Sequence, residues 1–566
     1  MSVLYVGGTL NHKYIHTQYS GGVMKTNLLL TLLLCCTFVG ISSAKVIKVP
    51  QDHAKIQLAV DAAVNGDTVL VAEGTYFENL VVTKKITLAS LYLIDQDTSH
   101  ISKTIIDGGT PSKPDSASVI LILPGTDSTT VVKGFTIQNG KGTRLSFVIP
   151  QVGTLTYRFG GGITIIANGG ATISTNTIKN NSCQTTEYAG AAGIMIAPDI
   201  NVTIGPNPWV IENNTIINNT SVGAESNGGG LNVTGRGRII NNVIKYNSST
   251  GSPIGDGGGM VIYGAPGEQN IELSNNLIMF NTASLLGGGI AMWQFPPPGP
   301  AIAIFKNNII ANNSAGIQGA AIAIKGGDCS LINNTITGNI GPNAIYLGGS
   351  GTFTGDRGHL AFRLMNNIVW NPNSTHEFNR TDSVTSAYNL VRGGLTGTGN
   401  ISTDPLFVAN DSLYRLNPNS PCISAGVMSA SVGGSTLSAP AFDLFGMNRP
   451  RPSNTKPDLG AIESDVSTGV TELISDKLPA FFSLSQNYPN PFNPSTVISY
   501  QLPVNSLVSL KIYDLLGREV ATLVNEEKPA GSYEVTFDGK NLSSGIYFYK
   551  LQTGDFVETK RMLMIK

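Results

Sequence analysis

A short unit that looks like a β-strand pair recurs through residues 160–371, and it constrains the fold more than any other feature of the sequence. Each copy opens with small residues before alternating aliphatic ones, as at residues 160–165 and 287–290, and closes on an asparagine two positions before another aliphatic. The seven asparagines, 26–38 residues apart, are Asn176, Asn214, Asn242, Asn276, Asn308, Asn334 and Asn367. Constant strands joined by loops of variable length are typical of a solenoid.

The residues within each unit identify the kind of solenoid. Alternation such as Ile-Thr-Ile has a period of two, and no unit contains a helix of useful length, so the units are strands. We therefore expect an all-β chain built on a right-handed parallel β-helix. Stacked asparagine amides can donate and accept between coils, and asparagine tolerates the left-handed backbone of a tight bend. The asparagines should form a structural ladder.

Composition excludes one class of partner. The formal net charge is −1, only 13% of the residues are charged, and no basic run is present. Nucleic acid is therefore not expected as a partner. The many glycines, 65 in all, suit a β-protein rich in turns.

The amino-terminal region reads as a targeting segment. Residues 24–44 have one early lysine, an apolar run and small residues before residue 45, which is the pattern of a secretory signal peptide. Residues 1–23 match nothing downstream and are interpreted as an over-called start. The mature chain contains no run long enough for a transmembrane helix.

The mature chain opens with residues that carry a family resemblance. An amphipathic helix is predicted at about residues 54–65, where it would cover the open end of the solenoid. The surrounding pattern, IQLAVDAA, then GDTV, GTY and EN between residues 56 and 79, resembles the pectin-lyase-like right-handed β-helix superfamily. We expect this β-helix domain to span residues 45–465, with a closing segment at about 404–463 that resembles the end of many secreted bacterial β-helix proteins.

The chain changes character after a polar linker at residues 466–482. Six short alternating strands after residue 483 predict a small Ig-like β-sandwich. Residues 483–566 closely resemble the carboxy-terminal sorting domain of type IX (Por) secretion cargo. The resemblance implies the type IX machinery as a partner, and a protein that is secreted or held at the outer-membrane surface of a Gram-negative bacterium.

The superfamily usually places catalytic groups on the outward face of the first strand of each coil. Here that face is expected to carry no acid, base or histidine, because its residues are Thr164, Met195, Asn232, Val261, Ala291, Ala323 and Tyr346. The densest titratable cluster is Asp356, Arg357 and His359, which could supply a base and an anion clamp or form a solvated loop. Asp256 is a candidate Ca²⁺ ligand, but Leu286 interrupts its column, so no cofactor is expected.

Two further features suggest contact surfaces. Trp293 could form a sugar-stacking wall or anchor a stiff loop. On the strand after each ladder asparagine, Leu277, Met279, Ile309 and Trp370 should point outward and build an apolar strip. The expected cover of this strip is the loop at residues 294–300, a second copy of the chain, or a ligand.

Two functions remain open on this basis. The bare first-strand face favours a non-catalytic rod for adhesion or for contact with a polysaccharide or cell-surface glycan. The superfamily resemblance favours a polysaccharide lyase or glycoside hydrolase whose site lies in the loops.

Overall fold

The computed structural model describes most of the mature chain. The described residues are 44–149, 153–166, 169–197, 208–264, 269–294, 301–348, 361–379, 384–453, 455–464, 482–484, 487, 490, 492–502, 506–515, 517–529, 531–553 and 556–565. The expected signal peptide, apart from residue 44, and almost all of the expected linker lie outside this set. Asp356, Arg357, His359 and the loop at 295–300 also lie outside it.

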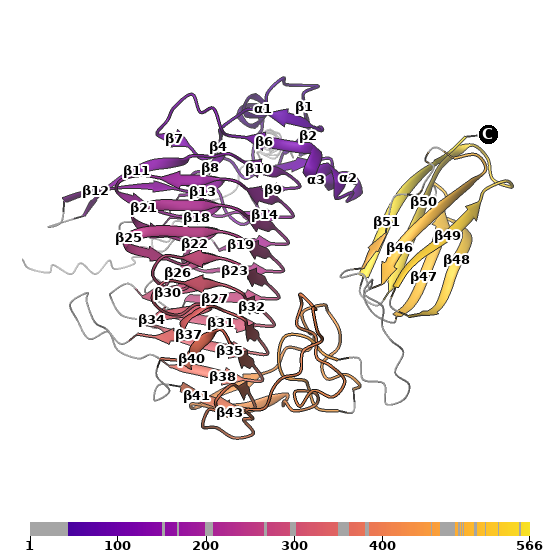
Figure 1. Ribbon diagram of the computed structural model, residues 1–566. Helices are drawn as coiled ribbons and strands as arrows, with labels where there is room; N and C mark the ends of the chain where they lie inside the picture. Colours follow the sequence, from indigo (N-terminus) through magenta and orange to yellow (C-terminus); the bar gives the residue numbers. More distant parts are fainter. Residues whose placement is uncertain are drawn as a thin grey trace, which may run out of the picture. The chain divides into compact units, whose positions relative to one another are not determined.

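Residues 45–391 wind into a β-helix whose coils stack as parallel sheets (Figure 1). Sheet A runs in the order β1 (Val46–Val49), β2 (Thr68–Val71), β5 (Thr87–Ser90), β9 (Val131–Lys133), β14 (Thr172–Ser174), β19 (Trp209–Glu212), β23 (Gly237–Ile240), β27 (Gln269–Ser274), β31 (Ala301–Lys306), β35 (Asp328–Ile332), β38 (Phe362–Met365) and β41 (Val384–Ala387). Sheet B runs in the order β3 (Gly74–Tyr76), β6 (Thr104–Asp107), β10 (Thr136–Gln138), β15 (Thr177–Lys179), β20 (Thr215–Ile217), β24 (Val243–Lys245), β28 (Leu277–Met279), β32 (Ile309–Ala311), β36 (Thr335–Thr337), β39 (Ile368–Trp370) and β42 (Leu390–Val391). The predicted parallel β-helix is confirmed.

Two more sheets complete the coils. Sheet C runs in the order β4 (Leu80–Val82), β8 (Ile120–Ile122), β13 (Ile163–Ile165), β18 (Ile194–Ile196), β22 (Leu231–Thr234), β26 (Met260–Gly264), β30 (Ile290–Gln294), β34 (Ile322–Lys325), β37 (Gly341–Leu347) and β40 (Ser374–Phe378). Sheet D contains β7 (Ser116–Ala117), β11 (Gly142–Ile149), β12 (Gly153–Phe159), β16 (Ser182–Gln184), β17 (Tyr188–Ala189), β21 (Thr220–Asn227), β25 (Ser248–Asp256), β29 (Thr282–Ala283) and β33 (Ser314–Ala315). Sheet D, which the sequence did not predict, lies between sheets B and C along the chain.

The predicted asparagine ladder stands at the bend between sheets A and B. The backbone N–H and Nδ2 of Asn176 both donate to Oδ1 of Asn214 in the next coil, at 3.0 and 3.1 Å. The same pattern continues through the predicted asparagines and beyond them to Asn389 and Asn400. Each ladder side chain is buried and fully engaged, so the column satisfies backbone groups that water cannot reach.

The sequence-based account of the bend was off by one residue. The left-handed position is the residue before the ladder asparagine, for example Thr175 with φ 57° and Asn275 with φ 58°. The ladder asparagines are therefore selected for their amides, while the preceding residue is selected for its backbone.

A second asparagine ladder stands at the other end of sheet B, and the sequence analysis missed it. Its members are Asn181, Asn219, Asn247, Asn281, Asn313, Asn339 and Asn371. The first six follow an asparagine of the first ladder by five residues, and Asn371 follows Asn367 by four. The aliphatic side chains between the two ladders, such as Ile178 and Ile278, point into the core.

The amino-terminal end of the β-helix is covered by helix α1 (Ile56–Ala62), which lies within the range expected for a capping helix. Ile56, Ala59 and Val60 of this helix belong to the same buried cluster as the strands below. Two short helices, α2 (Tyr92–Asp95) and α3 (Ser99–Lys103), follow strand β5.

The closing segment does more than end the solenoid, because it packs along the outer face of the later coils. Leu277, Met279 and Ile309 form one cluster with Ala461 and Ile462 of this segment. Trp370 packs with Leu416 and Leu459 in a neighbouring cluster. The strip formed by Leu277, Met279, Ile309 and Trp370 does point outward from the β-helix, but its proposed role as an open contact surface is wrong, since the chain itself covers it.

Hydrogen bonds fix the closing segment to the left-handed asparagines of the first bend. Nδ2 of Asn307 donates to the carbonyl of Phe442 at 2.8 Å, and Arg449 Nη1 donates to Asn307 Oδ1 at 2.8 Å. Asn333 and Asn366 likewise donate to Asp458 and Val427 carbonyls. A hairpin of β43 (Ser429–Val432) and β44 (Ser435–Ser438) adds its apolar side to sheet A.

The carboxy-terminal domain is a separate antiparallel sandwich. One sheet contains β45 (Ser483–Leu484), β46 (Ser495–Leu502) and β49 (Gly531–Asp538), and the other contains β48 (Glu519–Lys528), β47 (Ser506–Tyr513), β50 (Gly545–Thr553) and β51 (Phe556–Met564). Side chains from both sheets, including Tyr500, Tyr549 and Leu510, share one core. The predicted β-sandwich is confirmed.

Candidate functional site

The predicted inward and outward positions of sheet C are confirmed, but the conclusion that its outer face is chemically bare is wrong. Ile290 and Met292 of β30 lie in the core, whereas Ala291 between them does not. Each of the strands β26, β30 and β34 continues past its first outward residue, which is Val261, Ala291 and Ala323 respectively. A second outward row follows, in which Tyr263 pairs with Trp293 and Trp293 pairs with Lys325 on successive strands.

The first outward row is buried except for Tyr346, which is partly exposed. Thr164 bonds to Ser118 at 2.9 Å, and Met195 packs against Phe159 of sheet D. Val261, Ala291 and Ala323 are small and at most 2% exposed. The groups available for contact are therefore those of the second row, together with Tyr346.

Sheet D brings a second set of side chains to the same place. Tyr157, Tyr188 and Glu225 occupy one row across strands β12, β17 and β21. The rings of Tyr157 and Tyr188 lie 4.9 Å apart between centroids. The negative charge of Glu225 raises the pKa of both Tyr157 and Tyr263, after the larger effect of burial, so this row lies near the second row of sheet C.

Glycine-rich bends set the spacing between the two sheets. Strand β25 ends at Asp256 and β26 begins at Met260, with Gly257 at φ 65° between them. A Cβ on Gly258 would meet the Thr282 carbonyl oxygen at 2.4 Å, so a side chain there would require the adjacent backbone to shift. The sharp turn places Asp256 directly beside the outer face of sheet C.

We call the resulting set of side chains the C–D corner. Its members are Tyr157, Tyr188, Glu225, Asp256, Tyr263, Trp293 and Lys325. Except for Asp256, all of them are partly exposed. The corner thus combines aromatic rings with two carboxylates and one amine.

Trp293 lies close to two charged side chains, Lys325 and Asp256. The Nζ of Lys325 lies 4.0 Å from the centroid of the Trp293 ring, which is a close cation–π contact. The indole N–H lies near the Asp256 carboxylate and helps to lower its pKa. Trp293 is therefore a fixed ring on strand β30 rather than part of a loop.

Asp256 is fully buried, with Oδ1 accepting the backbone N–H of Leu286 at 3.1 Å. Burial raises its pKa to about 6, and the charge of Lys325 opposes this rise only in part. Burial also lowers the pKa of Lys325. The column that contains Asp256 and is interrupted by Leu286 is present, and Asn227 and Gln318 are its other members, since these residues are bridged in register.

Within the part of the chain that the structure describes, no three or more His, Cys, Asp or Glu side chains are grouped so that they could hold a metal ion. Asp256 as a Ca²⁺ ligand would therefore have too few acidic partners in the described residues, where Glu225 is the carboxylate that acts on it. Its nearest charged neighbour in the corner is Lys325, a cation that competes with any metal ion.

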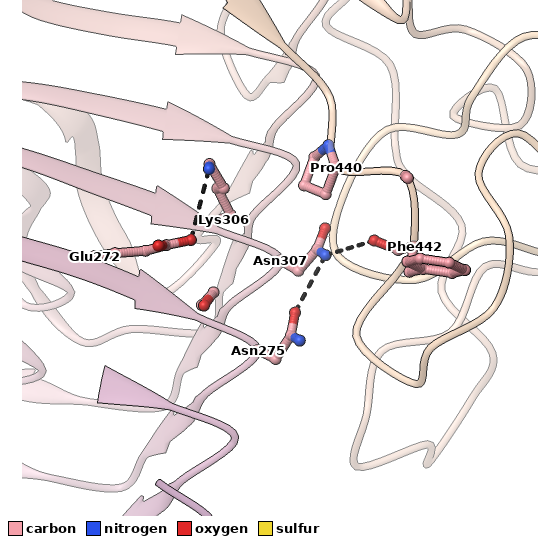
Figure 2. A pocket seen from close by; sticks show the side chains of 8 residues that line it. Glu272, Asn275, Lys306, Asn307, Pro440 and Phe442 are labelled. Atoms are coloured by element: carbon pink, nitrogen blue, oxygen red, sulfur yellow. Dashed lines mark hydrogen bonds and ion pairs between the residues drawn. The ribbon is translucent and has the colours of Figure 1, made fainter. Parts of the chain in front are cut away.

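A pocket of about 230 Å³ lies elsewhere, at the seam between sheet A and the closing segment (Figure 2). Its polar side chains largely pair with one another. Glu272 and Lys306 form an ion pair at 3.5 Å, and Asn307 bridges Asn275 and the carbonyl of Phe442. The pocket is a consequence of docking the closing segment, and it offers less aromatic surface than the C–D corner.

The fold and the corner define a parallel β-helix protein with an aromatic, partly acidic surface site. Residues 486–566 match the family model for the secretion system C-terminal sorting domain, which agrees with the sandwich seen there. The protein is therefore handled by the type IX secretion machinery and is secreted or displayed at the cell surface. Neither the curated proteins nor the solved structures gave a match to the chain. No helix in the described residues has the length and apolar character of a membrane span.

Proposed function

We propose that this protein is an exported β-helix rod that binds a polysaccharide or cell-surface glycan at the C–D corner. The observation that carries the proposal is the row of Tyr263, Trp293 and Lys325 on sheet C, which lies beside Tyr157 and Glu225 of sheet D. A sugar ring has apolar C–H faces and a rim of hydroxyl groups. Fixed aromatic faces with a few polar groups beside them suit both parts.

The aromatic groups of the corner are held in place before a ligand arrives. Trp293 is clamped by Lys325, and Tyr157 stacks on Phe159 with 5.2 Å between ring centroids. Side chains that are already ordered lose little conformational entropy on binding. Successive coils present outward side chains at equivalent positions, and this regular spacing along the β-helix suits an extended chain of sugar units.

Binding to immobilised or soluble polysaccharide tests this proposal. Trp293→Ala should weaken binding at least tenfold, because it removes the central ring of the site. The matched control is Phe280→Asn, which removes an exposed ring stacked on Tyr246 at a different bend. Asparagine occupies the same left-handed position in other coils, for example Asn312, so this control preserves the backbone. Equal binding by wild type and Trp293→Ala would contradict the proposal.

A cleaving enzyme is the second candidate, and one observation favours it. Glu225 and Asp256 lie on neighbouring strands of sheet D, and burial raises the pKa of both carboxyl groups. Glycoside hydrolysis needs two carboxyl groups, one kept protonated by a raised pKa as the general acid and one ionised as the base or nucleophile. The full burial of Asp256 weighs against direct contact with a substrate. Release of reducing ends that is lost in both Glu225→Gln and Asp256→Asn would favour this candidate over pure binding.

A further inference from the structure

The charge of the C–D corner indicates which class of glycan it can accept, and this inference rests on the proposed function. The corner contains two carboxyl groups, Glu225 and Asp256, and one amine, Lys325. No arginine or histidine joins them in the described residues of the corner. Above the pKa of Asp256 the set carries one net negative charge.

The single cation is already engaged. The Lys325 ammonium group lies over the Trp293 ring at 4.0 Å and is attracted by the Asp256 carboxylate. A ligand carboxylate would have to compete with both contacts. Lys325 is therefore poorly placed to neutralise an acidic sugar.

Glu225, by contrast, is an acceptor that pairs with no cation among the residues that the structure describes. Among the described ion pairs none includes Glu225, and its side chain is only partly buried. Its neighbour in the row is Tyr188, with Tyr157 beyond it, and Tyr263 of sheet C lies close by; none of these three side chains is a cation. A half-buried carboxylate of this kind gains from hydroxyl donors and repels other carboxylates.

We infer that the C–D corner binds an uncharged polysaccharide and rejects polyuronates. Sugar hydroxyl groups donate to Glu225, and the apolar faces of the sugar rings lie on Trp293 and Tyr263. A polyuronate brings one carboxylate per residue toward Glu225 and Asp256, where the described residues of the corner offer no open cation to offset it. Glu225 is thus the residue that sets the charge selectivity of the site.

The test is a binding panel with the purified full chain at low ionic strength. The uncharged probes are a galactan, a xylan and a mixed-linkage glucan, and the charged probes are polygalacturonate and alginate. Wild type should retain at least one uncharged probe and neither polyuronate. Glu225→Gln should strengthen polyuronate binding about fivefold, because it removes a nearby like charge.

Glu212→Gln is the matched control, since Glu212 lies on sheet A and its substitution changes the net charge by the same amount. Polyuronate binding that rises equally in both variants, or a wild type that prefers polyuronates, would overturn the inference and leave glycan binding intact. If no probe binds to the wild type, the proposed function fails and this inference fails with it.

Discussion

Glu377 ends the second asparagine ladder by taking the place of the next asparagine. The backbone N–H of Asn371 donates to Oε1 of Glu377 at 2.8 Å, and Nδ2 of Asn371 donates to Oε2 at 2.7 Å. Arg392 then balances the charge through an Nε–Oε1 contact of 2.7 Å. The ladder can end here because a carboxylate accepts hydrogen bonds on both oxygens and has no N–H group that would need a further acceptor.

Glu377→Ala should lower the free energy of unfolding of the β-helix by about 2–4 kcal/mol, because it leaves the buried donors of Asn371 without partners. Chemical denaturation followed by circular dichroism measures the loss. Glu187→Ala is the control, since Glu187 forms only an exposed pair with Arg144 and should cost less than about 1 kcal/mol. Equal losses in the two variants would mean that Glu377 does not terminate the ladder.

The covered strip on sheet B gives a second prediction. Met279 is 1% exposed beneath the closing segment, whereas Ile217, two coils earlier in the same column, is only partly buried. Lys245 stands between them in that column, so a lysine fits the strand itself. Met279→Lys should therefore lower the free energy of unfolding by about 3 kcal/mol, because the lysine would be buried beneath the closing segment. Ile217→Lys should lower it by less than about 1 kcal/mol.

Limited proteolysis shows whether the loss of stability in Met279→Lys arises at the closing segment. In Met279→Lys, cleavage within residues 404–463 should become faster, since the closing segment loses its apolar seat. Unchanged cleavage together with unchanged stability would show that the segment does not depend on this contact.

Asp256 should make the corner sensitive to pH. Burial raises its pKa to about 6 in the folded protein, above the ordinary value near 3.8. The group therefore contributes stability that is complete below about pH 4 and is lost as the pH rises through 6. Ionisation also changes the charge beside the Trp293 indole.

Tryptophan fluorescence can follow this ionisation. The chain contains three tryptophans, and Trp209 is buried in the core while Trp370 packs against the closing segment. Emission should therefore change with a midpoint near pH 6 that arises from Trp293. Asp256→Asn should abolish this transition, and a transition that persists in this variant would assign it to another group.

The sequence predicted the parts of the fold that repeat locally. The ladder asparagines recur in successive coils from Asn176 onward, and the alternation of Ile163 and Ile165 fixes the inward face of a strand. The second ladder was equally visible as an asparagine five residues after the first, for example Asn281 after Asn276. The segment that follows it, which contains the sheet D strands, varies in length between coils. The sandwich strands were predicted for the same reason as the coils, because alternation is a local signal.

The site could not be predicted in the same way. Its members are spread from Tyr157 to Lys325, and they meet only because sheet D turns back toward sheet C. A signal for half of it was present, since Tyr263, Trp293 and Lys325 each stand three residues after the first inward aliphatic of their strands. The burial of Leu277 could not be predicted from its sequence neighbours either, because the residues that cover it lie more than 130 positions away in the chain.

A crystal structure of the protein with an oligosaccharide of an uncharged polysaccharide that it retains would test the central claim most directly. The account predicts sugar rings against Trp293 and Tyr263, with a hydroxyl group within hydrogen-bonding distance of Glu225. Sugar density confined to another face of the β-helix, or to the pocket beside Lys306 and Phe442, would contradict it.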